Sequence, residues 1–124
     1  MTTVYLMKLR TEPAIFTERE ALFLCHSDMA RVATVSADGQ PHVVPVAFEF
    51  DGRYLYFSGR ALAKSLKFRH LTRNNKVAIV IDDVVSISPW YARGIEIRGI
   101  AELLKEEGLP YVRITPLAKA SWGL

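Results

Sequence analysis

The sequence has few residues that form disulfides or bind metals. Cys25 is the only cysteine among 124 residues, so no disulfide can form within the chain. The three histidines, His26, His42 and His70, stand far apart and offer no short-spaced set of zinc ligands. The composition therefore predicts a cytoplasmic protein without a bound metal.

Long hydrophobic runs are also missing. No uninterrupted apolar run exceeds five residues, whereas a membrane-spanning helix needs about 20. The first ten residues lack the apolar centre of a secretory signal peptide. Half of the residues are nevertheless hydrophobic and 23% are charged, which is typical of a globular protein. We therefore expect one folded domain over residues 1–124 that neither enters a membrane nor carries a secretion signal.

Acidic residues are absent from one quarter of the chain. Between Gly52 and Ile81 there are seven basic residues and no aspartate or glutamate, although the net charge of the whole chain is only +3. Nearly half of the sixteen lysines and arginines thus lie in this basic segment. The concentration favours an anionic ligand, and a helix face that is simply solvated is the alternative.

The first half of the sequence predicts one helix and three strands. Thr17 and Glu20 have the spacing of a capping box, which predicts a helix from about residue 18 to residue 26. Two Asp-Gly pairs mark turns between segments with β-branched or alternating apolar residues. These segments are predicted to form an antiparallel meander of strands over residues 31–36, 41–50 and 54–58.

The second half predicts one more helix, over residues 61–72, and three more strands. These strands are expected over residues 76–82, 95–104 and 111–115, the last one stopped by Pro116. The connection 83–93 is long and aromatic, so it is either a functional loop or a cover for one end of the barrel. Together the elements predict a mainly β fold with some α, a six-stranded antiparallel barrel with two short helices.

The junction between the third strand and the second helix is the strongest candidate for a binding site. Gly59 stands at the corner, and a helix that starts after it offers free N–H groups and a positive dipole end to a phosphate. At about 100° per residue, the cations of the expected helix fall on one stripe and can converge on one group. The side-chain donors at the junction are Ser58, Arg60, Lys64, Ser65 and Lys67.

Catalytic motifs are weak throughout the sequence. Residues 59–65 resemble a P-loop, but Ala63 replaces its second glycine, which excludes a nucleotide triphosphatase of that class. Cys25 continues an apolar run, so we expect a buried, inert thiol and not a thiolate paired with His26. His42 either faces a ligand at the mouth of the barrel or is a hydrogen-bonded structural histidine. Without a convincing acid and base of its own, the chain is expected to leave the reaction to a bound cofactor.

Several segments resemble the pyridoxamine-phosphate-oxidase-like flavin-binding split barrels. The similarity covers about residues 31–124 and begins with the run Ala33-Thr-Val-Ser-Ala-Asp-Gly-Gln-Pro-His-Val-Val-Pro-Val46. Residues 89–102 and the ending Ser121-Trp-Gly-Leu124 are similar to the branch that depends on the deazaflavin coenzyme F-420. The resemblance implies a homodimer of six-stranded split barrels with the cofactor, FMN or F-420, at the subunit interface.

The resemblance also implies roles for individual residues. Lys67 would bind the cofactor phosphate, in agreement with the anion site at the same junction, and Trp90 and Arg93 would reach the cofactor of the partner subunit. The strand from His42 to Ala47 would line the ring system through backbone groups. The implied cofactor-binding residues are His42, Val44, Pro45, Val46, Ser58, Gly59, Arg60, Lys64, Ser65, Lys67 and Trp90.

The sequence departs from the family pattern at two places, which limits what the resemblance implies about contacts and substrate. His70 stands where the family usually has an asparagine, so the polar contact of that asparagine is in question. The C-terminal Arg-Leu-x-Pro element of the vitamin-processing oxidase is absent, because this chain has Val112-Arg-Ile-Thr-Pro116. Oxidation of pyridoxine phosphate is therefore not expected.

The resulting hypothesis is a flavin- or deazaflavin-binding oxidoreductase that transfers hydride between FMN or F-420 and a small organic substrate. A cofactor carrier without turnover shares the same site and stays open as an alternative. A barrel that binds single-stranded nucleic acid through the basic segment and Tyr54, Tyr56 and Phe68 is less favoured. The chain also carries thirteen acidic residues, and these aromatics alternate with core positions as ordinary strand residues do.

Overall fold

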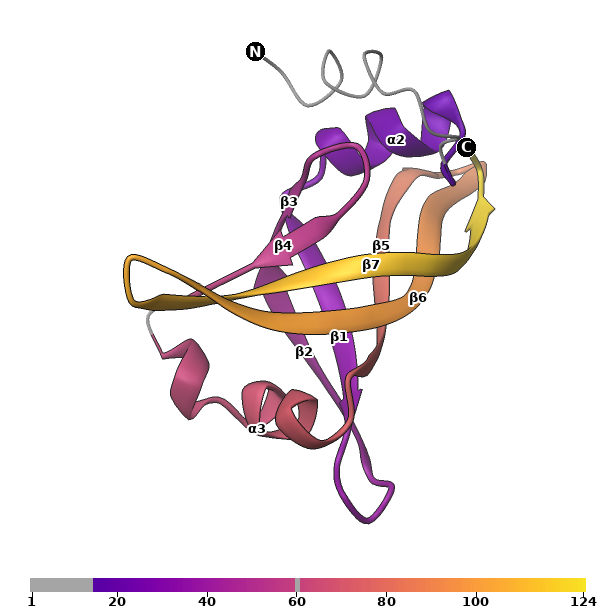
Figure 1. The fold of residues 1–124 in the computed structure, drawn as a ribbon. Coiled ribbons are helices and arrows are strands. Elements are labelled where there is room, and N and C mark those ends of the chain that lie inside the picture. The colour runs from indigo at the N-terminus through magenta and orange to yellow at the C-terminus, as the bar shows by residue number, and fades with distance from the viewer. Residues whose placement is uncertain (1–14, 60) are drawn as a thin grey trace.

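One antiparallel sheet forms most of the computed structural model, which describes residues 15–59 and 61–124 (Figure 1). Its strands have the order β2-β1-β5-β6-β7-β4-β3. They are β1 (Met29–Val35), β2 (Pro41–Ala47), β3 (Glu49–Phe50), β4 (Leu55–Phe57), β5 (Lys76–Ile87), β6 (Trp90–Glu106) and β7 (Leu109–Trp122). The helices are α2 (Glu18–Cys25), the short 3₁₀ turn η1 (Leu62–Lys64) and α3 (Leu66–Arg73).

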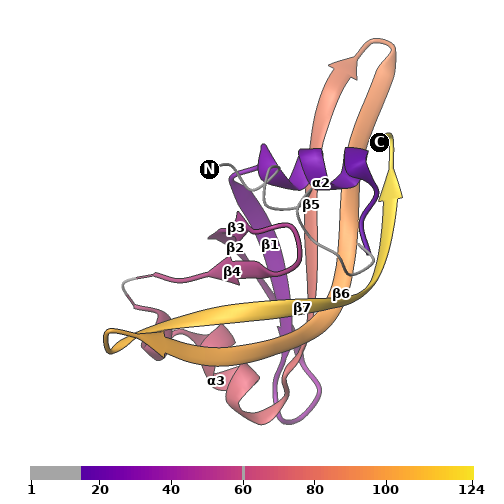
Figure 2. The same cartoon turned by 45° about the horizontal axis from the view of Figure 1, so that its top comes forward.

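The two α-helices of the described residues lie at opposite ends of the curled sheet (Figures 1 and 2). Helix α2 begins with the predicted capping box: Glu20 N–H donates to Thr17 Oγ1 at 3.1 Å, and Thr17 N–H donates to Glu20 Oε1 at 2.8 Å. The helix buries Ala21 and Leu24 against the core. None of the helices in the described ranges is long and apolar enough to cross a membrane.

The core confirms the alternation of apolar residues along the strands. Leu55 and Phe57 of β4 are buried, while Tyr56 between them is only partly covered. The largest fully buried side chains belong to β1, β4, β5, β6, β7 and α2, so the two layers of the curled sheet share one core. These side chains are Leu24, Val32, Leu55, Ile79, Ile81, Ile95, Ile97, Val112 and Ile114.

The prediction of six strands is wrong because the expected strand over residues 41–50 divides at Phe48. Its first part, β2, pairs with β1, and its second part, β3, pairs with β4. Strands β2 and β3 are the two edges of the sheet, so the chain passes from one edge to the other at Phe48. The Phe48 N–H donates to the carbonyl of Asp28 at 3.1 Å, and its side chain is buried. This corner closes the sheet into a barrel.

The connection predicted over residues 83–93 is instead a hairpin. Strand β5 continues to Ile87, and β6 starts at Trp90 after a two-residue turn with a cis Ser88–Pro89 peptide bond. The β-branched residues before the turn favour a strand, and the two strands pair up to the turn. The hairpin projects beyond the barrel (Figure 2).

Pro116 does not stop the final strand, contrary to the prediction. Strand β7 continues to Trp122, and a shift of register between Arg98 and Gly99 places Gly99 opposite Pro116. A Cβ on Gly99 would lie 2.3 Å from the carbonyl oxygen of Thr115, so only glycine fits there. A bulge of this kind accommodates a proline that cannot donate a ladder hydrogen bond.

Candidate functional site

The second helix starts later than predicted, because Ser65 interrupts the expected helix over residues 61–72. Ser65 has an extended backbone, with φ −76° and ψ 155°, and separates η1 from α3. Its hydroxyl oxygen accepts a hydrogen bond from the Phe68 N–H at 3.3 Å, which makes Ser65 the N-cap of α3. The single stripe of cations is therefore wrong: Lys64 precedes the cap, and Lys67 lies in the first turn of α3. Arg60 lies outside the described residues.

Replacing the N-cap Ser65 with alanine is expected to lower the free energy of unfolding by about 1 kcal/mol. The substitution removes the hydroxyl that caps the Phe68 N–H and leaves that group to water. Thermal or urea unfolding followed by circular dichroism measures the change. The exposed Ser58, which precedes the helix and caps nothing, provides a matched control, and Ser58→Ala should stay within about 0.5 kcal/mol of the parent. Equal losses for both variants would contradict the cap.

The donors at the junction suit a phosphate group. The N–H groups of Leu66 and Lys67 belong to the first turn of α3, where a helix supplies no internal partner. No acidic residue occurs in that turn, and within residues 15–59 and 61–124 neither Lys64 nor Lys67 forms an ion pair. Two free N–H groups and an unneutralised lysine therefore stand together at a positive helix end.

The corner before η1 is open. Ser58 and Gly59 follow β4 and are exposed. A Cβ on Gly59 would meet no atom of the described residues within 4 Å. The φ angle of Gly59 also lies outside the left-handed region that favours glycine. Neither packing nor backbone strain thus explains this glycine, and the open corner leaves room for a group to approach the backbone.

Strand β2 supplies an unpaired edge next to α3. It pairs only with β1, so part of its backbone N–H and C=O groups face away from the sheet. Val46 is buried and Val44 packs against the core, whereas Pro45 is exposed. The side chains of Val44 and Val46 therefore belong to the barrel, and a ligand along β2 would contact the backbone and Pro45.

His42 and His70 join β2 to α3. Their rings meet edge to face, with centroids 5.4 Å apart and an angle of 88°. His70 is buried, and its Nδ1 lies 2.9 Å from the hydroxyl of Thr34 on β1, so this histidine makes a polar contact within the fold. His42 Nδ1 is buried without a hydrogen-bond partner among the described residues. The hydrogen-bonded structural role considered for His42 is thus not seen among the described residues, whereas His70, whose polar contact was in question, has one with Thr34.

Trp90 is not part of this junction within one chain. It is 68% exposed beside the turn of the β5–β6 hairpin, and that turn lies at the far end of the barrel from α3 (Figure 2). Arg93 is engaged in its own chain, where its Nε donates to Asp83 Oδ1 at 2.7 Å. The structure therefore groups Ser58, Gly59, Lys64, Ser65 and Lys67 on one continuous segment, with His42 beside α3, and leaves Trp90 apart.

Comparison with known proteins identifies relatives of this chain. The chain is 37% identical to the 5a,11a-dehydrotetracycline/5a,11a-dehydrooxytetracycline reductase of Streptomyces rimosus over 119 residues, which cover 88% of this chain and 84% of the reductase. A conserved hypothetical protein from Mycobacterium tuberculosis has a similar structure, with a TM-score of 0.75, 22% identity, and coverage of 92% of this chain and 88% of that one.

A structure described as an F420 reductase is also similar, with a TM-score of 0.69, 23% identity, and coverage of 85% of this chain and 98% of that one. These structural likenesses confirm the split β-barrel class. The sequence profile of the pyridoxamine 5′-phosphate oxidase family matches residues 16–121, which is most of the chain. The chain therefore belongs to the pyridoxamine 5′-phosphate oxidase family.

Proposed function

We propose that this protein is an oxidoreductase of one domain, residues 1–124, that transfers hydride between FMN or coenzyme F-420 and a small organic substrate. The observation that carries the proposal is the junction of β4 and α3. There, the first-turn N–H groups and Lys67 offer donors for a phosphate, with no neutralising carboxylate among the described residues. The 37% identity to a reductase over 88% of the chain supports the reaction class.

The proposed site assigns each candidate residue a binding role. Lys67 and the first turn of α3 would hold the cofactor phosphate, with Ser58, Gly59, Arg60, Lys64 and Ser65 beside them. The backbone of His42, Val44, Pro45 and Val46 would run along the ring system, and Trp90 would reach the site of a second subunit. When bound, such a cofactor supplies the hydride chemistry, while the chain binds it, orients it and excludes water.

Binding of the two cofactors is tested directly. The purified protein is titrated separately with FMN and with F-420, and the fluorescence of each is followed. We expect one of them to bind at micromolar concentration, and binding of neither would overturn the proposal. A cofactor carrier would bind the same cofactor as an oxidoreductase but would not turn it over. The two are distinguished by adding electron donors and acceptors to the protein with its bound cofactor. The absorbance of the cofactor then shows whether it is reduced or oxidised.

Binding of nucleic acid receives no support from the tyrosines. Tyr54 is covered by the guanidinium groups of Arg53 and Arg113, which lie 5.0 Å and 4.8 Å from its ring centroid. Burial and the hydrogen bond that Tyr56 donates to Asp51 raise the pKa of its hydroxyl to about 12. These rings are engaged within the fold and are not free platforms for stacking bases.

We also propose a homodimer with the cofactor at the subunit interface. Val84, Val85, Ile87 and Trp90 on the projecting hairpin are between 50% and 79% exposed, which is a large apolar area for a monomer. Light scattering should return about twice the 14.0 kDa mass of the chain. Ile87→Asp is expected to shift the mass toward the monomer without unfolding the barrel. A parent mass of 14.0 kDa at every concentration would contradict the dimer.

The expected location of the protein in the cytoplasm stays a prediction.

A further inference from the structure

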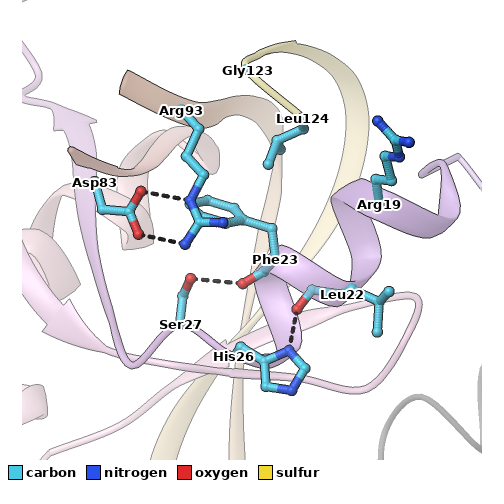
Figure 3. Close-up of a pocket in the computed structure, with 9 residues that line it drawn as sticks. All are labelled: Arg19, Leu22, Phe23, His26, Ser27, Asp83, Arg93, Gly123 and Leu124. Carbon is cyan, nitrogen blue, oxygen red and sulfur yellow. Dashed lines mark hydrogen bonds and ion pairs between the residues drawn. The ribbon is translucent and has the colours of Figure 1, made fainter. Parts of the chain in front are cut away.

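A hollow of about 480 Å³ is lined partly by α2 (Figure 3), the helix that lies at the opposite end of the barrel from α3 (Figure 1). It lies between three separate parts of the chain: helix α2, the strands β5 and β6 at Asp83 and Arg93, and the segment Gly123–Leu124. Its volume lies within the range of small-molecule sites, which is about 300–1,000 Å³. None of the candidate residues of the β4–α3 junction lines it, and of the two residues that the resemblance places at a partner subunit's cofactor it contains only Arg93.

One wall of the hollow is a fixed guanidinium group. Arg93 donates from Nε to Asp83 Oδ1 at 2.7 Å and from Nη2 to Asp83 Oδ2 at 3.0 Å. The same guanidinium lies over the ring of Phe23, 5.1 Å from its centroid, as Figure 3 shows. Two hydrogen bonds and one ring fix the plane of this group. Phe23 is the only ring that it contacts among the described residues, and the Arg93 side chain is 40% exposed, so we expect its second face to accept a planar ligand.

A second wall is one face of α2, the helix that also carries Phe23. Arg19, Leu22, Phe23 and His26 have the spacing i, i+3, i+4 and i+7, so their side chains lie along one stripe of the helix. Leu22 is 36% exposed and offers apolar surface. The Nδ1–H of His26 donates to the carbonyl of Leu22 at 2.8 Å, because a carbonyl can only accept, and the ring is thereby fixed at the rim.

Arg19 gives the hollow its charge. The charge of Arg93 is balanced by Asp83, and the hydrogen bond from Arg93 lowers the pKa of that carboxyl. Arg19 is exposed and has no ion-pair or hydrogen-bond partner in the part of the chain that the structure describes. In Figure 3 it stands across the hollow from Asp83. Its guanidinium is thus free to bind both oxygens of a carboxylate or a similar anion.

We propose that this hollow binds a flat, conjugated organic anion, with a carboxylate or enolate oxygen on Arg19. The ring system would lie on the face of the Arg93 guanidinium that points away from Phe23, with Leu124 at its edge. The inference uses neither the phosphate site nor a cofactor bound there. The residue it shares with the implied cofactor contacts is Arg93, which the resemblance places at the cofactor of a partner subunit.

The test compares two probes of the same shape and different charge. Isothermal titration of the full-length protein with 2-naphthoate is expected to show binding about 10-fold tighter than with neutral 2-naphthamide. Arg19→Gln should remove that difference and weaken naphthoate binding about 10-fold, as expected for the loss of a charge-assisted pair in an open site. Arg98→Gln changes an exposed arginine that pairs with Glu96 outside the hollow and should leave naphthoate binding unchanged.

Amide NMR shifts locate the bound probe. Naphthoate should move the signals of residues 19–27 and 123–124 and leave those of residues 58–67 in place. No binding at millimolar naphthoate, equal binding of the amide, or shifts confined to residues 58–67 would overturn the proposal. Arg19→Gln should bind FMN or F-420 as the parent does. If the parent binds neither cofactor, the proposed function fails and the naphthoate result still decides this inference.

Discussion

Replacing Lys67 with alanine is expected to weaken cofactor binding by about 10- to 100-fold. A cofactor phosphate carries a charge of about −1.5 to −2, and Lys67 stands in the first turn of α3 without an ion-pair partner among the described residues. A hydrogen bond to a charged group contributes roughly 1.5–3 kcal/mol, which corresponds to this change in the dissociation constant. Isothermal titration with whichever cofactor binds the parent measures it.

The control for Lys67 is Lys105, an exposed lysine near the end of β6. Lys105→Ala removes the same charge from the chain but lies outside the junction, so its cofactor affinity should match that of the parent. Both variants should unfold at the temperature of the parent, because neither lysine forms an ion pair in the described structure. Equal affinities for the Lys67 variant and the parent would refute the phosphate site and leave the basic segment as a solvated face.

Features that depend on neighbouring residues could be predicted from the sequence. The capping box of α2 needs only Thr17 and Glu20 at the right spacing, and both of its hydrogen bonds form. The alternation along β4 predicts which of its side chains are buried, and the structure confirms that Leu55 and Phe57 face the core. Local patterns of this kind fix the type of an element because period and capping are properties of the segment itself.

Features that depend on distant parts of the chain could not be predicted in this way. The division of the strand at Phe48 follows from closure of the barrel. The continuation of β7 past Pro116 depends on a bulge in β7 at Leu117, opposite Arg98 and Gly99 of β6. The start of α3 at Ser65 was missed for another reason. A capping box needs a glutamate or glutamine three residues after the cap, and Phe68 stands at that position.

The two candidate sites also differ in how far apart their residues lie in the sequence. The junction that is proposed to bind phosphate could be predicted because its residues are nearly consecutive, from Ser58 to Lys67. The contact between Thr34 and His70 joins residues 36 positions apart. The hollow beside α2 joins Arg19 and Phe23 to Arg93 and Leu124, and no local pattern brings these residues together. Sequence reasoning could accordingly propose the junction as a site, but not the hollow.

Replacing Lys119 with methionine is expected to lower the free energy of unfolding by about 3 kcal/mol at pH 7, the cost of leaving a buried carboxylate without its partner. Glu20 is 3% exposed, and its carboxylate accepts hydrogen bonds from Lys119 and, at 2.6 Å, from Ser121. Burial raises the pKa of Glu20, but the hydrogen bonds from Lys119, Ser121 and the Thr17 N–H, with the charge of Lys119, outweigh it and lower the pKa to about 2. The pair ties α2 to β7.

The pH dependence distinguishes this pair from a simple packing contact. The depressed pKa of Glu20 means that its contribution is fully present above about pH 4.5 and is lost as the pH falls toward about 2. Without Lys119, burial dominates and the pKa of Glu20 rises. The stability difference between parent and Lys119→Met should therefore be largest at pH 7 and shrink at pH 3, as measured by urea unfolding at both values.

Two further variants test the assignment of this loss to the buried charge. Lys119→Met combined with Glu20→Gln leaves no unpaired charge at the site, so it should be more stable at pH 7 than Lys119→Met alone. Arg98→Met breaks the exposed pair with Glu96, in which Arg98 is 62% exposed, and should cost about 0–1 kcal/mol. A Lys119→Met loss as small as that of Arg98→Met, or one equal at pH 3 and pH 7, would show that the charge of Lys119 does not hold α2 on the barrel.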